Sequence, residues 1–228
     1  QPLHNIGGVV TIKGELDFTF LEKAINHFVK NNDGIRHRFI ETEGEVRQYV
    51  EKYHKIDVLN VVFNCQEDLD AWVQQEAGKP FTIHDCDLFD FAMFKVRDTN
   101  DGGYFVKVHH IISDGWSMNL LTEQIFDTYM RLLKGENIID QHRDSYTLCL
   151  KKEQTYLASE RFMKNKQFWN EKFNTLPIPI QKRELECAEG NRKTYCFPNS
   201  QSNGIKQFAA DHNVSAYAFF VGLYYIYL

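Results

Sequence analysis

The sequence predicts an α/β fold in the form of an α+β sandwich, with a mixed sheet flanked by helices. Segments that alternate apolar and polar side chains, as strands do, are interspersed with segments of helical periodicity. The turn Asn100-Asp101-Gly102-Gly103 separates two alternating segments, and this arrangement predicts a hairpin. In addition, 43% of the 228 residues are hydrophobic, which is enough to build a substantial core.

Seven strands are expected from the alternating segments and their flanking turns. The sequence Asn32-Asp33-Gly34 predicts a turn into the second strand, and Glu43-Gly44 predicts a hairpin turn between the second and third. In chain order the strands are expected at 6–14, 35–41, 46–51, 56–63, 88–97, 103–111 and 192–198.

Six helices are expected from the apolar periodicity. Asp17 or Thr19 can cap the first helix, Pro80 follows the second, and Gly135 ends the third. The fourth is long and charged and is closed by Pro177. The helices are expected at 18–31, 67–78, 117–134, 145–174, 200–212 and 214–228.

The domain organisation predicted from these elements is a first lobe, a linker and the start of a second lobe. The first lobe is expected over 1–175, the proline-containing linker over 176–191 and the truncated second lobe over 192–228. The last helix is apolar on all faces, which predicts that it is buried. Since the chain also lacks an initiator Met, we expect a fragment of something longer, inactive alone and prone to self-association through apolar surface.

The composition excludes several classes of protein. A net charge of −5 offers no excess of positive charge for nucleic acid. The start of the chain lacks the pattern of a signal peptide, and the apolar run at 216–228 is too short to cross a membrane, for which about 20 residues are needed. The five cysteines are odd in number and form no C-x-x-C pair, so we expect free thiols in a cytoplasmic protein without a zinc site.

The most informative motif is His109-His110-Ile111-Ile112-Ser113-Asp114-Gly115, which begins where a predicted strand ends. Because side chains alternate along a strand, His109 and His110 are expected on opposite faces. Three other interpretations remain open. The histidines could be structural, His110 and Asp114 could bind a metal although a third ligand is missing, or Ser113 could act in a serine triad although it lacks a nucleophile elbow.

The motif resembles the HHxxxDG signature of the condensation domains of nonribosomal peptide synthetases, which share the chloramphenicol acetyltransferase fold. Other segments resemble the same family. Gly14-Glu15-Leu16-Asp17 is similar to its first strand-helix passage. Ile35-Arg36-His37-Arg38-Phe39 is similar to its LRTxF segment, with His where Thr is usual. Ser145-Tyr146, and Phe168-Trp169 through Leu176-Pro177, are similar to later segments of its first lobe. The resemblance covers nearly the whole chain but only about the first half of the family's domain.

The resemblance implies roles for the residues of the motif. It makes His110 the active-site residue, His109 its supporting neighbour and Gly115 a donor whose N–H faces the developing oxyanion. It also makes Asp114 structural, paired with Arg36, and Arg38 on the same strand face is the fallback partner. Which residues bind substrate is left unknown. No cofactor or metal is expected to bind the domain.

The activity implied is that of an amide-forming acyltransferase in the biosynthesis of antibiotics and other secondary metabolites. Donor and acceptor thioesters are carried on the phosphopantetheine of upstream and downstream carrier proteins, next to an adenylation domain. The alternatives are a lipid-initiating starter or epimerisation variant, a free-standing acyl-CoA-dependent enzyme, and a catalytically silent domain that recruits partners. A basic face could meet an acidic carrier protein, although a solvated helix face is the plainer interpretation; it carries Lys151, Lys152, Arg161, Lys164, Lys166 and Lys172.

Overall fold

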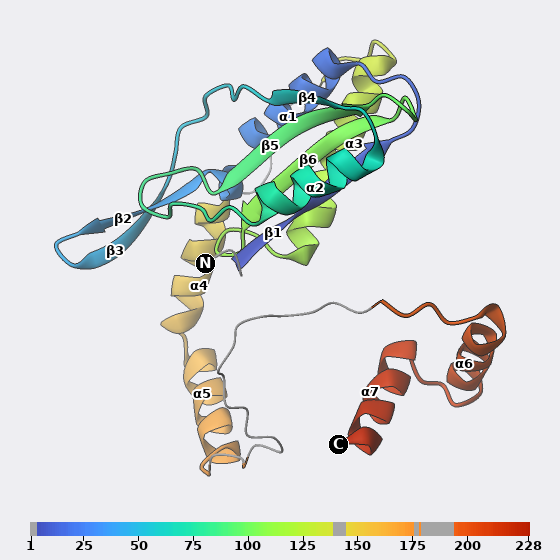
Figure 1. Ribbon diagram of the computed structural model, residues 1–228. Coiled ribbons are helices and arrows are strands. Elements are labelled where there is room, and N and C mark those ends of the chain that lie inside the picture. The colour runs from blue at the N-terminus through green and yellow to red at the C-terminus, as the bar shows by residue number, and fades with distance from the viewer. Residues whose placement is uncertain (1–3, 139–144, 176–177, 179–193) are drawn as a thin grey trace. The chain divides into compact units, whose positions relative to one another are not determined.

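The computed structural model describes residues 4–138, 145–175, 178 and 194–228 (Figure 1). The chain divides into two compact units, residues 1–159 and 160–228, which are described separately below. The assignment of two lobes with boundaries at 175 and 192 stays a prediction, and the predicted linker 176–191 lies outside the described residues except for Ile178. No helix of the described chain has the length and apolar composition needed to cross a membrane.

A four-stranded sheet forms the centre of the first unit, in the order β1 (Asn5–Ile12), β6 (Gly102–His109), β5 (Phe89–Val96) and β4 (Leu59–Phe63). β6 runs antiparallel to both β1 and β5, whereas β4 runs parallel to β5. The predicted mixed sheet and the predicted hairpin between β5 and β6 are therefore confirmed. At the hairpin, Asn100 adopts a positive φ of 55°.

Helices cover both faces of this sheet (Figure 1). α1 (Phe18–Asn31) and α3 (Gly115–Leu133) lie on one face, where buried side chains such as Leu21, Ile25 and Leu121 join those of β5 and β6 in the main core. α2 (Gln66–Ala77) lies on the other face and packs Leu69 against β4 and β5. Of the two predicted caps of α1, Asp17 is the one formed, because its Oδ1 accepts from the Phe20 N–H at 3.0 Å.

A separate hairpin, β2 (His37–Thr42) and β3 (Glu45–Val50), extends from the first unit (Figure 1). Its predicted turn is confirmed, since Glu43 and Gly44 both have positive φ. The strand predicted from residue 35 begins later, because 33–36 form a 3-10 turn, η2 (Asp33–Arg36).

Two further boundaries differ from the prediction for local reasons. The strand expected from 56 begins at 59, because the Asn26 amide of α1 binds both the N–H and the carbonyl of Ile56. The helix expected over 145–174 is two helices, α4 (Tyr146–Leu157) and α5 (Glu160–Lys172). At the break, both the N–H and the hydroxyl of Ser159 donate to the Tyr156 carbonyl, which ends α4.

In the second unit, α6 (Asn199–Asp211) and α7 (Ala216–Tyr227) contact each other through Phe208 and Phe219, with ring centroids 5.3 Å apart. The strand predicted at 192–198 is wrong for its described part, 194–198, which forms no ladder because this unit offers no partner strand among its described residues. The predicted burial of the last helix is also wrong for the described chain. No residue of α7 is buried, and Ile226 is 84% exposed.

Candidate functional site

β6 delivers the two histidines of the motif to different surroundings. The strand is buried along its whole length between β1 and β5. Val106 and Val108 point into the core beneath α1 and α3, whereas Phe105 packs against Trp72 of α2. His109 follows the second set, and its ring lies near Phe81. The two imidazoles therefore lie on opposite faces of the sheet, as the alternation of side chains along the strand predicts.

His109 is a buried, neutral side chain. Its residue is 8% exposed, and its Nδ1 accepts a hydrogen bond from the Ile111 N–H at 3.1 Å. Burial lowers the pKa of His109, and the neighbouring His4 and His110 lower it further. Because Nδ1 is the acceptor, the ring proton resides on Nε2. The imidazole thus supports the tight turn after β6.

His110 is the exposed member of the pair. Its backbone N–H donates to the His4 carbonyl at 2.7 Å, which fixes the chain at the end of the sheet. Its side chain lines a cavity of about 320 Å³, which we call the histidine cavity. The cavity is formed by the turn after β6, the first turn of α3, the β2–β3 hairpin with η2, and the start of α4; it is lined by Gly34, His37, Phe39, Gln48, His110, Ile111, Ile112, Ser113, Asp114, Ser117 and Tyr146.

Asp114 caps α3. Its Oδ1 accepts from the backbone N–H of Ser117 at 2.8 Å and from the Ser117 hydroxyl at 2.6 Å. These hydrogen bonds to the charged form lower the pKa of Asp114. The carboxylate is therefore held at the helix N-terminus, where its charge also complements the helix dipole.

The predicted ion pair between Asp114 and Arg36 is not formed. The Arg36 guanidinium instead donates to the carbonyls of Val29, Lys30 and Glu51. It thereby joins the end of α1 to the end of β3. Burial lowers the pKa of Arg36, an effect that Asp33 partly opposes.

The fallback partner, Arg38, is also engaged elsewhere. Its guanidinium binds Asp87 at 2.8 Å and lies 3.6 Å from Glu51. Arg36, at the end of η2, and Arg38, within β2, thus both anchor the hairpin, and Asp114 is held by its own helix.

Gly115 is the first residue of α3. A side chain added there would meet no atom within 4 Å, and its φ is not positive, so nothing in the described chain requires glycine at this position. Gly115 is also absent from the lining of the histidine cavity, which its neighbours Asp114 and Ser117 reach. The open space leaves room for another group to approach the backbone.

His37 is a site residue that the sequence reasoning missed. It is only 3% exposed, yet it lines the same cavity as His110. Its Nδ1 lies 3.1 Å from the Gly34 carbonyl, and its ring meets the edge of Tyr146 at a centroid distance of 4.7 Å. The one signal in the sequence was the unusual His within Ile35-Arg36-His37-Arg38-Phe39.

A second chamber of about 400 Å³ adjoins the histidine cavity. The two share the lining residues Gly34, Ile112, Ser113, Ser117 and Tyr146. Beyond these, the second chamber is lined by apolar residues that include Phe28, Ile35 and Leu121 and by polar residues that include Lys30, Asp33 and Gln124. A polar group at His110 and an apolar group in the second chamber could therefore belong to one molecule.

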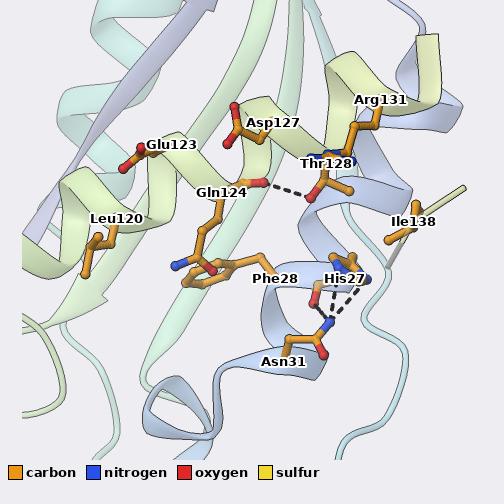
Figure 2. A pocket seen from close by; sticks show the side chains of 10 residues that line it. All are labelled: His27, Phe28, Asn31, Leu120, Glu123, Gln124, Asp127, Thr128, Arg131 and Ile138. Atoms are coloured by element: carbon orange, nitrogen blue, oxygen red, sulfur yellow. Dashed lines mark hydrogen bonds between the residues drawn. The ribbon is translucent and has the colours of Figure 1, made fainter. Parts of the chain in front are cut away.

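A third cavity, of about 260 Å³, lies between α1 and α3 (Figure 2). Figure 2 shows Asn31 directed at the His27 ring, and Glu123 and Asp127 projecting from α3. Both carboxylates are exposed, and none of the predicted site residues reaches this cavity. Within the described residues there is also no group of three or more His, Cys, Asp or Glu side chains that could hold a metal ion.

The chain is similar to known proteins over almost its whole length. The model of the condensation domain family matches residues 3–228. Surfactin synthase subunit 1 of Bacillus subtilis (strain 168) is 32% identical over 235 residues, which cover 99% of this chain and 6% of that protein. One plipastatin synthase subunit of the same organism is 30% identical, over 97% of this chain and 9% of that protein. The chain thus spans less than a tenth of either relative.

Solved structures share the fold. The first condensation domain of the calcium-dependent antibiotic synthetase, in complex with substrate analogue 3a, matches with a TM-score of 0.77 at 19% identity, over 94% of this chain and 53% of that chain. The starter condensation domain of rhizomide synthetase matches with a TM-score of 0.70 at 21% identity, over 78% and 44%. The predicted chloramphenicol acetyltransferase-like fold is thereby confirmed.

Proposed function

Because the chain belongs to the condensation domain family, we propose that it carries the reactive histidine of an amide-forming acyltransferase. The reaction joins a donor acyl or peptidyl thioester to an acceptor aminoacyl thioester. The acceptor amine attacks the donor carbonyl, a C–N bond forms, the C–S bond breaks, and the sulfur leaves as a thiol. Both thioesters are carried on phosphopantetheine arms of carrier proteins, and an adenylation domain supplies the activated amino acid.

The observation that carries this proposal is the placement of His110. Its side chain is exposed in a cavity, while its backbone is fixed to the His4 carbonyl and its neighbour His109 fills the turn behind it. An amine that attacks a thioester must lose a proton, and an imidazole can accept one near neutral pH. His110 therefore serves as the proton acceptor, or it orients the amine and stabilises the tetrahedral intermediate.

Gly115 fits the role of an oxyanion donor in this scheme. It begins α3, and the first N–H groups of a helix have no partner within the helix. The space beside its Cα is open, since a Cβ added there would meet no atom within 4 Å. Asp114 supports this role by capping the same helix turn, which fixes the direction of the N–H groups.

The second chamber favours one variant of the activity. Its apolar residues could receive the hydrocarbon part of a donor, as in a starter domain that joins a fatty acyl group to the first amino acid. A fatty acyl donor is therefore the second candidate.

The four cysteines of the described chain are free thiols, which supports placing the protein in the cytoplasm.

The test is amide formation by the native protein that contains this chain, with thioester-loaded carrier proteins as donor and acceptor and mass spectrometry as the readout. His110→Ala is expected to lower turnover by about 10²–10⁴-fold without a change in Tm. His54→Ala, which removes an exposed imidazole outside the cavity, is the matched control and should retain full turnover.

Comparison of aminoacyl, fatty acyl and acyl-CoA donors then separates the two candidates. Turnover with fatty acyl thioesters alone would identify the starter variant, and turnover with acyl-CoA in place of carrier-bound donors would overturn the role of the carrier. Full turnover by His110→Ala would refute the assignment of the reactive histidine.

A further inference from the structure

The histidine cavity contains a second imidazole, that of His37. It comes from the first residue of β2, whereas His110 comes from the end of β6, so two separate parts of the fold bring the rings to one space. His37 is nearly fully buried. The edge-on contact with Tyr146, with an interplanar angle of 78°, limits rotation of its ring.

The hydrogen bond of His37 determines which nitrogen carries its proton. The Gly34 carbonyl oxygen can only accept, so Nδ1, at 3.1 Å, is the donor. In the neutral ring Nε2 then carries a free lone pair. Nε2 has no hydrogen-bond partner within the described part of the chain. His37 thus presents an acceptor of fixed direction in a cavity that would contain the reacting amine.

Tyr146 is itself held in place. Its backbone N–H donates to Asp33 Oδ1 at 2.9 Å, and the Ser145 hydroxyl donates to the same carboxylate. These contacts attach the start of α4 to η2, next to Gly34. The ring that limits His37 and the carbonyl that accepts from it therefore belong to one hydrogen-bonded assembly.

We propose that Nε2 of His37 accepts a hydrogen bond from the attacking amine and that His37 is an acceptor-binding residue. The inference rests on the proposed function. A neutral primary amine has two N–H groups and one lone pair. One N–H is directed to His37, and the other faces His110, which takes that proton as the C–N bond forms and returns it to the departing sulfur. His37 keeps its own Nδ1 proton throughout, and the lone pair of the amine faces the donor carbonyl.

Other polar groups of the cavity are less suited to this role. Asp114 Oδ1 already accepts from the N–H and the hydroxyl of Ser117. The Ser117 hydroxyl donates to Asp114 and is only half-buried, and Gln48 on β3 is exposed, so neither is held as deeply in the fold as His37. His37 combines deep burial with an unused acceptor, which is what a positioning contact needs.

The test separates acceptor binding from donor binding in the native protein that contains this chain. His37→Phe keeps an aromatic ring against Tyr146 but removes Nε2, and His37→Gln restores a polar acceptor. We expect His37→Phe to raise the KM of the acceptor thioester about tenfold, with the KM of the donor unchanged, and His37→Gln to recover most of the loss. An unchanged acceptor KM in both variants, or an equal rise for donor and acceptor, would overturn the proposal.

A second measurement does not depend on turnover. Long-range ¹H–¹⁵N NMR of the wild-type imidazoles reports which nitrogen is protonated, and added aminoacyl-pantetheine should shift the Nε2 resonance of His37. A proton on Nε2, or no shift at saturating ligand, would refute the inference even if His37→Phe failed to fold. Absence of amide formation by the wild-type protein would instead refute the proposed function.

Discussion

The Ile111 N–H donates to Nδ1 of His109 across 3.1 Å, so the buried imidazole accepts a hydrogen bond from the turn that presents His110. A protonated His109 could not accept this bond, because both ring nitrogens would carry hydrogen. The turn is therefore built for a neutral imidazole, in agreement with the lowered pKa of His109. The two histidines differ in more than their direction, since one supports the backbone that carries the other.

The first prediction is that acidification lowers the free energy of unfolding through protonation of His109. Burial lowers the pKa of His109 in the folded protein below its ordinary value of 6.5, so the unfolded chain binds the proton more readily. The contribution of His109 to stability is complete above about pH 6.5 and is lost as the pH falls toward the lowered folded pKa. Urea unfolding between pH 8 and pH 5 should show this loss in the wild-type protein, with a smaller loss in His109→Phe.

The exposed His54 provides the control for that experiment. His54→Phe should follow the wild-type pH dependence. If His109→Phe and the wild-type protein lost stability in parallel over the whole range, His109 would not be the group responsible.

The second prediction concerns the capping role of Asp114. Asp114→Ala removes the acceptor of two hydrogen bonds at the start of α3 and should lower Tm, whereas Asp114→Ser should retain most of the cap. Because Arg36 binds backbone carbonyls elsewhere, the effects of Asp114→Ala and Arg36→Gln on the free energy of unfolding should add. A double-mutant cycle measured by urea unfolding checks this. A strong coupling between the two substitutions would instead indicate that Asp114 and Arg36 form an ion pair.

Adjacent glycines of β1 provide the third prediction. A Cβ at Gly7 would lie 2.6 Å from the Val106 carbonyl oxygen, whereas a Cβ at Gly8 would meet nothing within 4 Å. Gly7→Ala should therefore destabilise the protein by about 1–3 kcal/mol, because the backbone of β6 must shift. Gly8→Ala should change the stability by less than about 1 kcal/mol, in the stabilising direction.

Chemical denaturation of the two glycine variants measures this difference directly. Equal effects at the two positions would mean that β1 does not approach β6 more closely at residue 7 than at residue 8. The pair is well matched, since both residues lie in one strand and both changes add a single methyl group.

Much of the fold follows from local patterns in the sequence. The hairpin turns at Glu43-Gly44 and after β5, the cap at Asp17 and the amphipathic face of α1 all depend on neighbouring residues. Each of these was predicted, the cap as one of two candidates, because the physical cause and its effect lie within a few positions of each other.

The predicted strand boundaries differ from the structure where contacts with distant residues determine the backbone conformation. Residues 35 and 36 leave the predicted strand because Asp33 and Arg36 bind the start of α4, the end of α1 and the end of β3. Likewise, the amide of Asn26 holds residue 56 outside the sheet. No periodicity in the sequence can reveal a partner that lies tens of residues away.

The same distinction between local patterns and long-range contacts applies to the predictions for the candidate site. Alternation along β6 correctly assigned His109 and His110 to opposite faces. The partner of Asp114 was wrong, because a cap to Ser117 three residues away satisfies the same carboxylate as an ion pair would. His37 was missed because only the folded chain brings it into the cavity of His110.

The hydrogen bond from the His110 N–H to the His4 carbonyl also matters for any transfer of this segment into another protein. A segment that began with the strand, at Asn5, would leave out the carbonyl that binds the backbone of His110. His4, the residue before the first strand, therefore has to be included in any transferred segment that contains the motif, although the two are far apart in the sequence.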